Sequence, residues 1–157
     1  MDLYDFFNTF TTAVAKDVAL DLWAMAHFGH HVTVYPDLDF SNPPDSEDDT
    51  PYVIFHSPGK RSGQEMRTID YGMELWLVLN KSTHKTRAED NITEPAGVEL
   101  ISDFITKTQA AIVAALPANF MVDFEVVTDT IGMIPEIHGH LACEFMQRLV
   151  IGQDPLG

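Results

Sequence analysis

The chain has 157 residues, 45% of them hydrophobic, with ten Phe, four Tyr and two Trp, which is enough apolar material for one domain with its own core. Its 9 lysines and arginines against 24 acidic residues give a net charge of −15, which argues against broad nucleic-acid binding because counterion release from phosphate requires cations. The single cysteine, Cys143, excludes an intramolecular disulfide, and no apolar run reaches the ~18 residues of a membrane span.

The first predicted element is a helix from about Leu3 to Phe28. Apolar residues recur along it at steps of three and four, which is the spacing of one buried helical face. Asp2 is suited to cap its N-terminus, and Gly29 is suited to end it. The first five residues lack the basic charges that begin a signal peptide, so we expect a cytoplasmic protein.

A short strand, about His31 to Tyr35, leads into an acidic segment at residues 37–50. This segment holds two prolines and no basic residue, a composition typical of an extended, mobile loop. It is either a solvated excursion or an arm that meets a partner or neighbouring subunit. Its acidic residues are Asp37, Asp39, Asp45, Glu47, Asp48 and Asp49, and the last four are the candidate contact residues.

The next two strands form a predicted hairpin. Tyr52 to His56 is the first strand, and Met66 to Leu79 is a long second strand with an apolar residue at every second position. The predicted turn, residues 57–63, contains Pro, Gly and Ser. The basic residues in or near it are Lys60, Arg61 and Arg67. They are either solvated or in electrostatic contact with an acidic surface of another copy or partner.

The second half of the chain is predicted to contain one more helix and two more strands. Residues 81–91 are polar and indicate a loop. A second amphipathic helix is predicted to begin near Thr93 and to end before Pro117. Strands from Met121 to Val127 and from Ile137 to Ile151 follow, and the tail at residues 152–157 is expected to fray.

This order of elements predicts a single α+β domain over residues 1–157. We expect a largely antiparallel sheet of four to five strands, with two amphipathic helices packed on one face. Apolar residues also alternate onto the other face, and Trp76 is the largest of them. The set is Trp76, Val78, Ala142, Met146 and Val150. A small protein with a sheet that is apolar on both faces is expected to form subunit contacts.

One pattern near the end of the chain is typical of a metal site. His138 and His140 share a strand face, on which Glu144 also lies, and with the flanking glycines the spacing nearly reproduces the first metal motif of cupins. Two long helices and so few strands do not suit a cupin jelly roll. We therefore predict no catalytic residue, no metal and no cofactor. The alternative is a small α+β metal-dependent enzyme or ligand-binding domain that uses His138 and His140.

The order of elements resembles that of the tail terminator, or tail completion (minor tail), proteins of long-tailed bacteriophages and prophages. Four features carry the resemblance. The first is the N-terminal amphipathic helix, and the second is the strand with its polar loop (VTVYPDLDFSNPPDSEDDTPYVIFH). The third is the hairpin with a basic tip (SPGKRSGQEMRTIDYGMELWLVL). The fourth is the helix followed by two strands (GVELISDFITKTQAAIVAAL, then NFMVDFEVV and HGHLACEFMQRLVI).

The resemblance implies a structural protein of the virion tail that is not an enzyme and is assembled in the host cytoplasm. It implies a homo-oligomer, a hexameric ring that caps the tail tube and meets the head-tail connector. DNA would pass through the lumen without specific binding, and no membrane would be involved. The acidic composition fits a lumen that repels DNA, and the basic hairpin tip fits a contact with an adjacent subunit or the tube.

Overall fold

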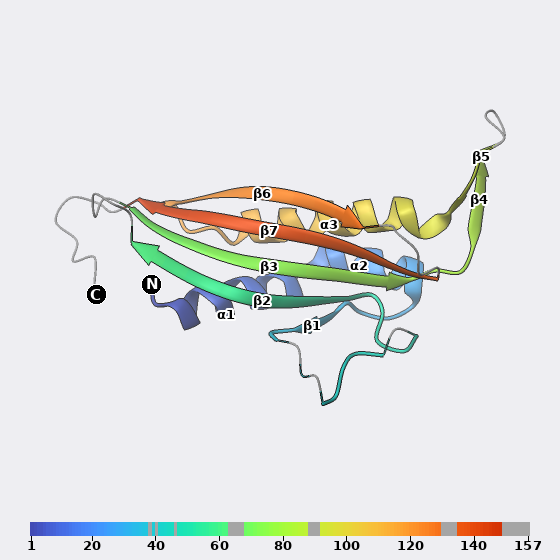
Figure 1. The fold of residues 1–157 in the computed structure, drawn as a ribbon, viewed down its shortest axis with the longest axis horizontal. Helices are drawn as coiled ribbons and strands as arrows, with labels where there is room; N and C mark the ends of the chain where they lie inside the picture. The colour runs from blue at the N-terminus through green and yellow to red at the C-terminus, as the bar shows by residue number, and fades with distance from the viewer. Residues whose placement is uncertain are drawn as a thin grey trace.

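A computed structural model describes residues 1–37, 39, 41–45, 47–62, 68–87, 92–129 and 135–148. In this part of the chain, a five-stranded sheet has the strand order β1-β2-β3-β7-β6 (Figure 1). The strands are β1 (Thr33–Tyr35), β2 (Tyr52–Ser62), β3 (Thr68–Asn80), β6 (Phe120–Asp129) and β7 (Glu136–Arg148). Only β1 and β2 pair in parallel, and the other neighbours are antiparallel. The predicted α+β class and largely antiparallel sheet are confirmed.

The helices α1 (Leu3–Ala15), α2 (Val18–Phe28) and α3 (Ala96–Ala114) all lie on one side of the sheet (Figure 1). Phe6 of α1 is fully buried, stacks on Tyr71 with ring centroids 4.4 Å apart and meets the edge of Phe145 at 4.9 Å. Gly139 of β7 allows α3 to approach closely, since a Cβ there would lie 2.9 Å from Ile105 Cδ1. The core therefore lies between the helices and one face of the sheet.

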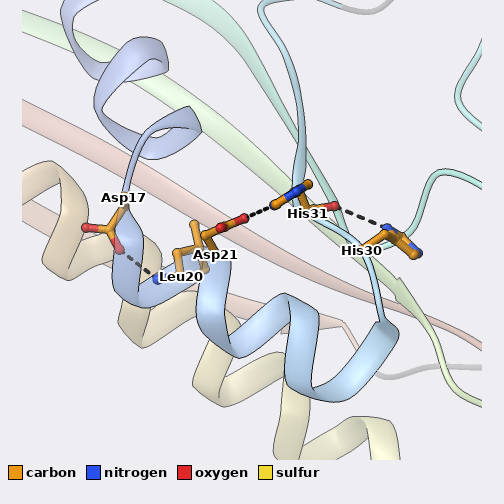
Figure 2. A network of polar contacts seen from close by, with 5 residues as sticks. All are labelled: Asp17, Leu20, Asp21, His30 and His31. Atoms are coloured by element: carbon orange, nitrogen blue, oxygen red, sulfur yellow. Dashed lines mark hydrogen bonds and ion pairs between the residues drawn. The ribbon is translucent and has the colours of Figure 1, made fainter.

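The predicted single helix from Leu3 to Phe28 is wrong, because the chain breaks at Lys16 and Asp17. Asp17 has an extended backbone, and its carboxylate accepts a hydrogen bond from the Leu20 N–H at 2.7 Å (Figure 2). This cap begins α2 as a separate helix, whose buried face does not continue the apolar spacing of α1. Leu20 is buried, whereas Val18 and Leu22, which continue the apolar spacing of α1 four and eight residues after Val14, are exposed.

Figure 2 also shows how the chain is held where it leaves α2. The left-handed Gly29 ends the helix, as predicted. His31 Nδ1 then pairs with the Asp21 carboxylate on the first turn of α2, and His30 Nδ1 lies 3.2 Å from the His31 carbonyl oxygen. These contacts fold the chain back along α2 so that β1 follows within a few residues.

Replacing Asp17 by alanine is expected to reduce the free energy of unfolding by about 1 kcal/mol, within a range of 0.5–2. The reason is that the Leu20 N–H loses its acceptor at the start of α2. Urea denaturation followed by circular dichroism measures this change. Asp17→Asn is the control, because asparagine caps a helix about as well as aspartate, and equal losses in both variants would contradict the capping role.

Two further loop predictions are corrected by the structure. Residues 57–62 of the predicted turn belong to β2 instead, because this strand continues to Ser62 after a register shift between His56 and Gly59, and residue 63 lies outside the described residues. Residues 84–87, predicted as loop, form β4 (His84–Arg87). This strand pairs with β5 (Ile92–Pro95) in a ribbon that stands away from the main sheet (Figure 1). Because Thr93 and Pro95 belong to β5, α3 begins at Ala96, later than predicted.

Candidate functional site

The candidate functional site is the face of the main sheet that the helices leave uncovered, which we call the open face. Along β3, alternate side chains such as Met73 and Leu75 are buried toward the helices, while Glu74 and Trp76 point the other way. Among the side chains that the structure describes, three large apolar ones remain substantially exposed on this face. They are Trp76 (45%), Met121 (49%) and Met146 (42%), of which Met121 and Met146 pair directly across β6 and β7.

Part of the apolar material predicted for this face is covered within the chain itself. Tyr52, Ile54 and Val78 are buried in a small cluster against Tyr35 of β1, whose ring meets that of Tyr52 edge-on at 5.8 Å. Burial, followed by the nearby Glu136 charge, raises the pKa of Tyr52 to about 12. Ala142 is half-buried, and Val150 lies outside the described residues. Exposure is thus concentrated at Trp76 and the methionine pair.

A groove of about 390 Å³ opens on this face where two glycines meet. Gly59 and Gly72 are paired across β2 and β3, so that no side chains fill the surface between their neighbours. The groove combines apolar, acidic and basic groups. Lining it on the open face are Arg61, Asp70, Met121, Asp123, Glu144 and Met146.

Two of the three predicted basic residues, Lys60 and Arg61, lie at the end of β2 that borders the groove. Arg61 lies opposite Asp70 in the register of β2 and β3. Lys60 faces the helical side, where its ammonium group lies 3.1 Å from the Met1 carbonyl oxygen and 5.5 Å from the centre of the Tyr71 ring. Arg67 lies outside the described residues.

The predicted acidic contact residues lie before the opposite end of β2. Asp45 accepts hydrogen bonds from the Glu47 and Asp48 N–H groups, which lower the pKa of its carboxyl. Asp49 accepts one from the Asp45 N–H, and burial together with the Asp49 charge raises the pKa of Tyr35. From Tyr52 to Arg61, ten residues of β2, the strand rises by about 30 Å at 3.3 Å per step. The acidic and basic groups are therefore separated along one strand (Figure 1).

Three potential metal ligands lie side by side near the middle of the open face. His56 pairs with Glu74 across β2 and β3, and His140 pairs with Trp76 across β3 and β7. Glu74 Oε2 is 3.3 Å from His140 Nε2 and 3.7 Å from His56 Nε2. The ligand atoms of His56, Glu74 and His140 all lie within 4.8 Å of one another. We call these three residues the His–Glu–His cluster.

Backbone irregularity at the end of the regular β2 pairing helps to position His56. Ser57 has a positive φ of 53°, which is uncommon for a residue other than glycine, and the register shifts directly after His56. The Ser57 hydroxyl is 3.0 Å from His56 Nδ1. Burial lowers the pKa of His56, with the His140 charge acting in the same direction and Glu74 opposing it.

The predicted alternative metal set is distributed differently in the structure. His138, His140 and Glu144 share the open face as predicted. However, His138 Nε2 lies 2.5 Å from Glu136 Oε1, and Glu144 lines the groove. Only His140 joins the His–Glu–His cluster. His56 and Glu74 could not be predicted as ligands from the sequence, because only the strand register brings them to His140.

No protein-family model matches this chain, and no curated protein is found to be similar to it. Among the residues that the structure describes, none of the helices is long and apolar enough to cross a membrane. Any functional inference therefore depends on the open face, the ribbon and the distribution of charge.

Proposed function

We propose that the chain is a structural protein of a phage or prophage tail, which assembles into a ring that caps the tail tube and joins it to the head connector. The observation that carries this proposal is the exposure of Trp76, Met121 and Met146 on the open face. Tryptophan and methionine are enriched at protein interfaces, and a tryptophan often provides much of the binding energy. A second copy of this chain is the partner we propose for this surface.

The β4–β5 ribbon supports assembly independently. A two-stranded ribbon is marginally stable in water without packing on another element. This one leaves the main sheet (Figure 1), and Ile92 on it is 42% exposed. In an assembled ring, a neighbouring subunit would cover the ribbon and bury Ile92.

The separation of charge along β2 favours a ring over a two-fold dimer. The acidic residues Asp45 to Asp49 precede one end of the strand, and Arg61 is near the other. Contact between these groups joins two copies head to tail, which is a heterologous interface, and such interfaces close into rings when the rotation permits. The net charge of −15 leaves many acidic groups to line a lumen that repels DNA.

The expected result is self-association that depends on Trp76. Six copies of the 17.6 kDa chain amount to about 106 kDa, which light scattering coupled to size-exclusion chromatography distinguishes from a monomer. Trp76→Glu is expected to shift the mass toward the monomer, alone and on tail tubes, because it places a charge in the interface. Leu22→Glu is the matched control, since Leu22 is an exposed apolar residue on α2, on the helical side.

A monomer at all concentrations with no binding to tail tubes would overturn the proposal. Equal effects of Trp76→Glu and Leu22→Glu would exclude the open face as the interface. The gene neighbourhood gives a separate test, because portal, connector and major tail genes are expected beside the gene for this chain.

A further inference from the structure

We propose that His56, Glu74 and His140 bind one divalent transition-metal ion, with Zn²⁺ as the representative ion. The sequence predicted no metal site, and this set also differs from the alternative set of His138, His140 and Glu144. The inference does not rest on the proposed function, because it uses only groups within one copy of the chain. It places a bound metal ion at the middle of the open face.

The distances within the cluster already approach those of a zinc site. In a tetrahedral site with ligand bonds near 2.0–2.1 Å, the ligand atoms are separated by about 3.3 Å. Glu74 Oε2 lies 3.3 Å from His140 Nε2 and 3.7 Å from His56 Nε2. The two imidazole rings are nearly parallel, at 13°, with centroids 6.3 Å apart. Small side-chain rotations would bring both nitrogens onto one ion.

The two imidazole nitrogens that face Glu74 lack an ordinary hydrogen bond. Nε2 of His56 and Nε2 of His140 are both shielded from solvent, and neither has a hydrogen-bond partner among the described residues despite its proximity to Glu74. Buried polar atoms without a partner are uncommon and call for an explanation. A bound cation would accept both nitrogen lone pairs and the carboxylate oxygen at once.

The surroundings favour metal binding over a plain ion pair. When His56 Nδ1 donates to the Ser57 hydroxyl 3.0 Å away, its Nε2 presents a lone pair toward Glu74, which is the form that ligates metals. Two imidazoles and one carboxylate suit zinc, cobalt, nickel or copper better than magnesium or calcium. Three protein ligands leave a fourth position for water or for a donor group of a bound partner.

Trp76 provides a local reporter of this site. Its ring lies 5.0 Å from that of His56 and 6.5 Å from that of His140, both edge-on. The other tryptophan, Trp23, is buried on α2 and stacks on Phe104. Titration of the full chain with Co²⁺ is expected to quench Trp76 fluorescence and to saturate at one ion per chain, and Zn²⁺ is expected to reverse the quenching by competition. Trp76→Phe should remove the signal without removing Zn²⁺ binding measured by calorimetry.

The variants separate this site from adventitious binding by other histidines. His56→Ala and His140→Ala are each expected to weaken Zn²⁺ binding at least about tenfold, as is Glu74→Gln, which keeps the shape of the side chain. His138→Ala is the matched control, because it lies two residues from His140 on the same strand face, and it should bind as the parent does.

Equal binding by the parent and the His56→Ala/His140→Ala double variant would overturn the proposal, as would an equal loss in His138→Ala. If an alanine variant fails to give the parental circular dichroism spectrum, Glu74→Gln provides the same test. The mass measurements with Trp76→Glu are separate from these titrations. Failure of the ring and failure of the metal site are therefore distinguishable.

Discussion

Phe6→Ala is expected to lower the free energy of unfolding by about 3–5 kcal/mol, because it removes a fully buried aromatic ring and leaves a cavity. Phe6 joins α1 to the sheet through ring contacts with Tyr71, Phe120 and Phe145, and it also contacts Phe10 on its own helix. At about 2–4 °C per kcal/mol for a chain of this size, the melting temperature should fall by about 6–20 °C.

Differential scanning calorimetry and urea denaturation both measure this loss. Tyr4→Ala is the matched control, because Tyr4 is an aromatic residue on the same helix whose side chain is 76% exposed. It is expected to change the stability by less than about 0.5 kcal/mol. A loss below about 1 kcal/mol for Phe6→Ala would mean that α1 does not pack on the sheet as described.

The thiol of Cys143 is expected to react with a disulfide reagent at least about a thousandfold more slowly in the native protein than in urea. Cys143 is 1% exposed on β7, and burial raises the pKa of its thiol from 9.0 to about 12. Three pKa units reduce the reactive thiolate a thousandfold at pH 8, and burial also limits access. Absorbance of the released chromophore, with and without urea, measures the two rates.

The same pKa shift has a defined effect on stability. The folded state holds the thiol proton more tightly than the unfolded state does. The stabilisation that the protonated Cys143 thiol gives to the folded state is therefore fully present below pH 9. It is lost as the pH rises from 9 toward 12. Rapid native reaction at pH 8, at a rate close to that in urea, would contradict the buried position of Cys143 between the sheet and the helices.

The sheet could be predicted from sequence because its two longest strands have strict alternation. Met73, Leu75 and Leu77 on β3, and Leu141, Cys143 and Phe145 on β7, are all buried on the helical side. A period of two over so many residues is incompatible with a helix, so the element type and the buried face were both determined.

The break between α1 and α2 was missed for a specific reason. Val14, Val18, Leu22 and Met25 continue the apolar spacing across it, and only the capping role of Asp17 marks the change. The β4–β5 ribbon was missed because its residues have no apolar alternation. The ribbon is held by backbone pairing between β4 and β5 and by a polar contact, in which the Thr86 and Thr93 hydroxyls lie 3.0 Å apart.

The candidate site was only partly accessible to sequence analysis. Trp76 could be placed on the second face by counting along one strand. The His–Glu–His cluster depends on the register between β2, β3 and β7, and on the bulge after His56, neither of which the spacing of residues along one strand determines. His140 was recognised as a possible ligand, but the two residues beside it come from other strands.

β6 lies at one edge of the sheet, and its side chains restrict how two copies of the chain can join edge to edge. An edge strand can accept another strand through its outward backbone groups, which is a route to uncontrolled fibre growth. Asp123 and Glu125 are exposed along β6, so two such edges brought together would oppose carboxylate to carboxylate. Like-charge repulsion between these carboxylates thereby disfavours extension of the sheet from copy to copy through this edge.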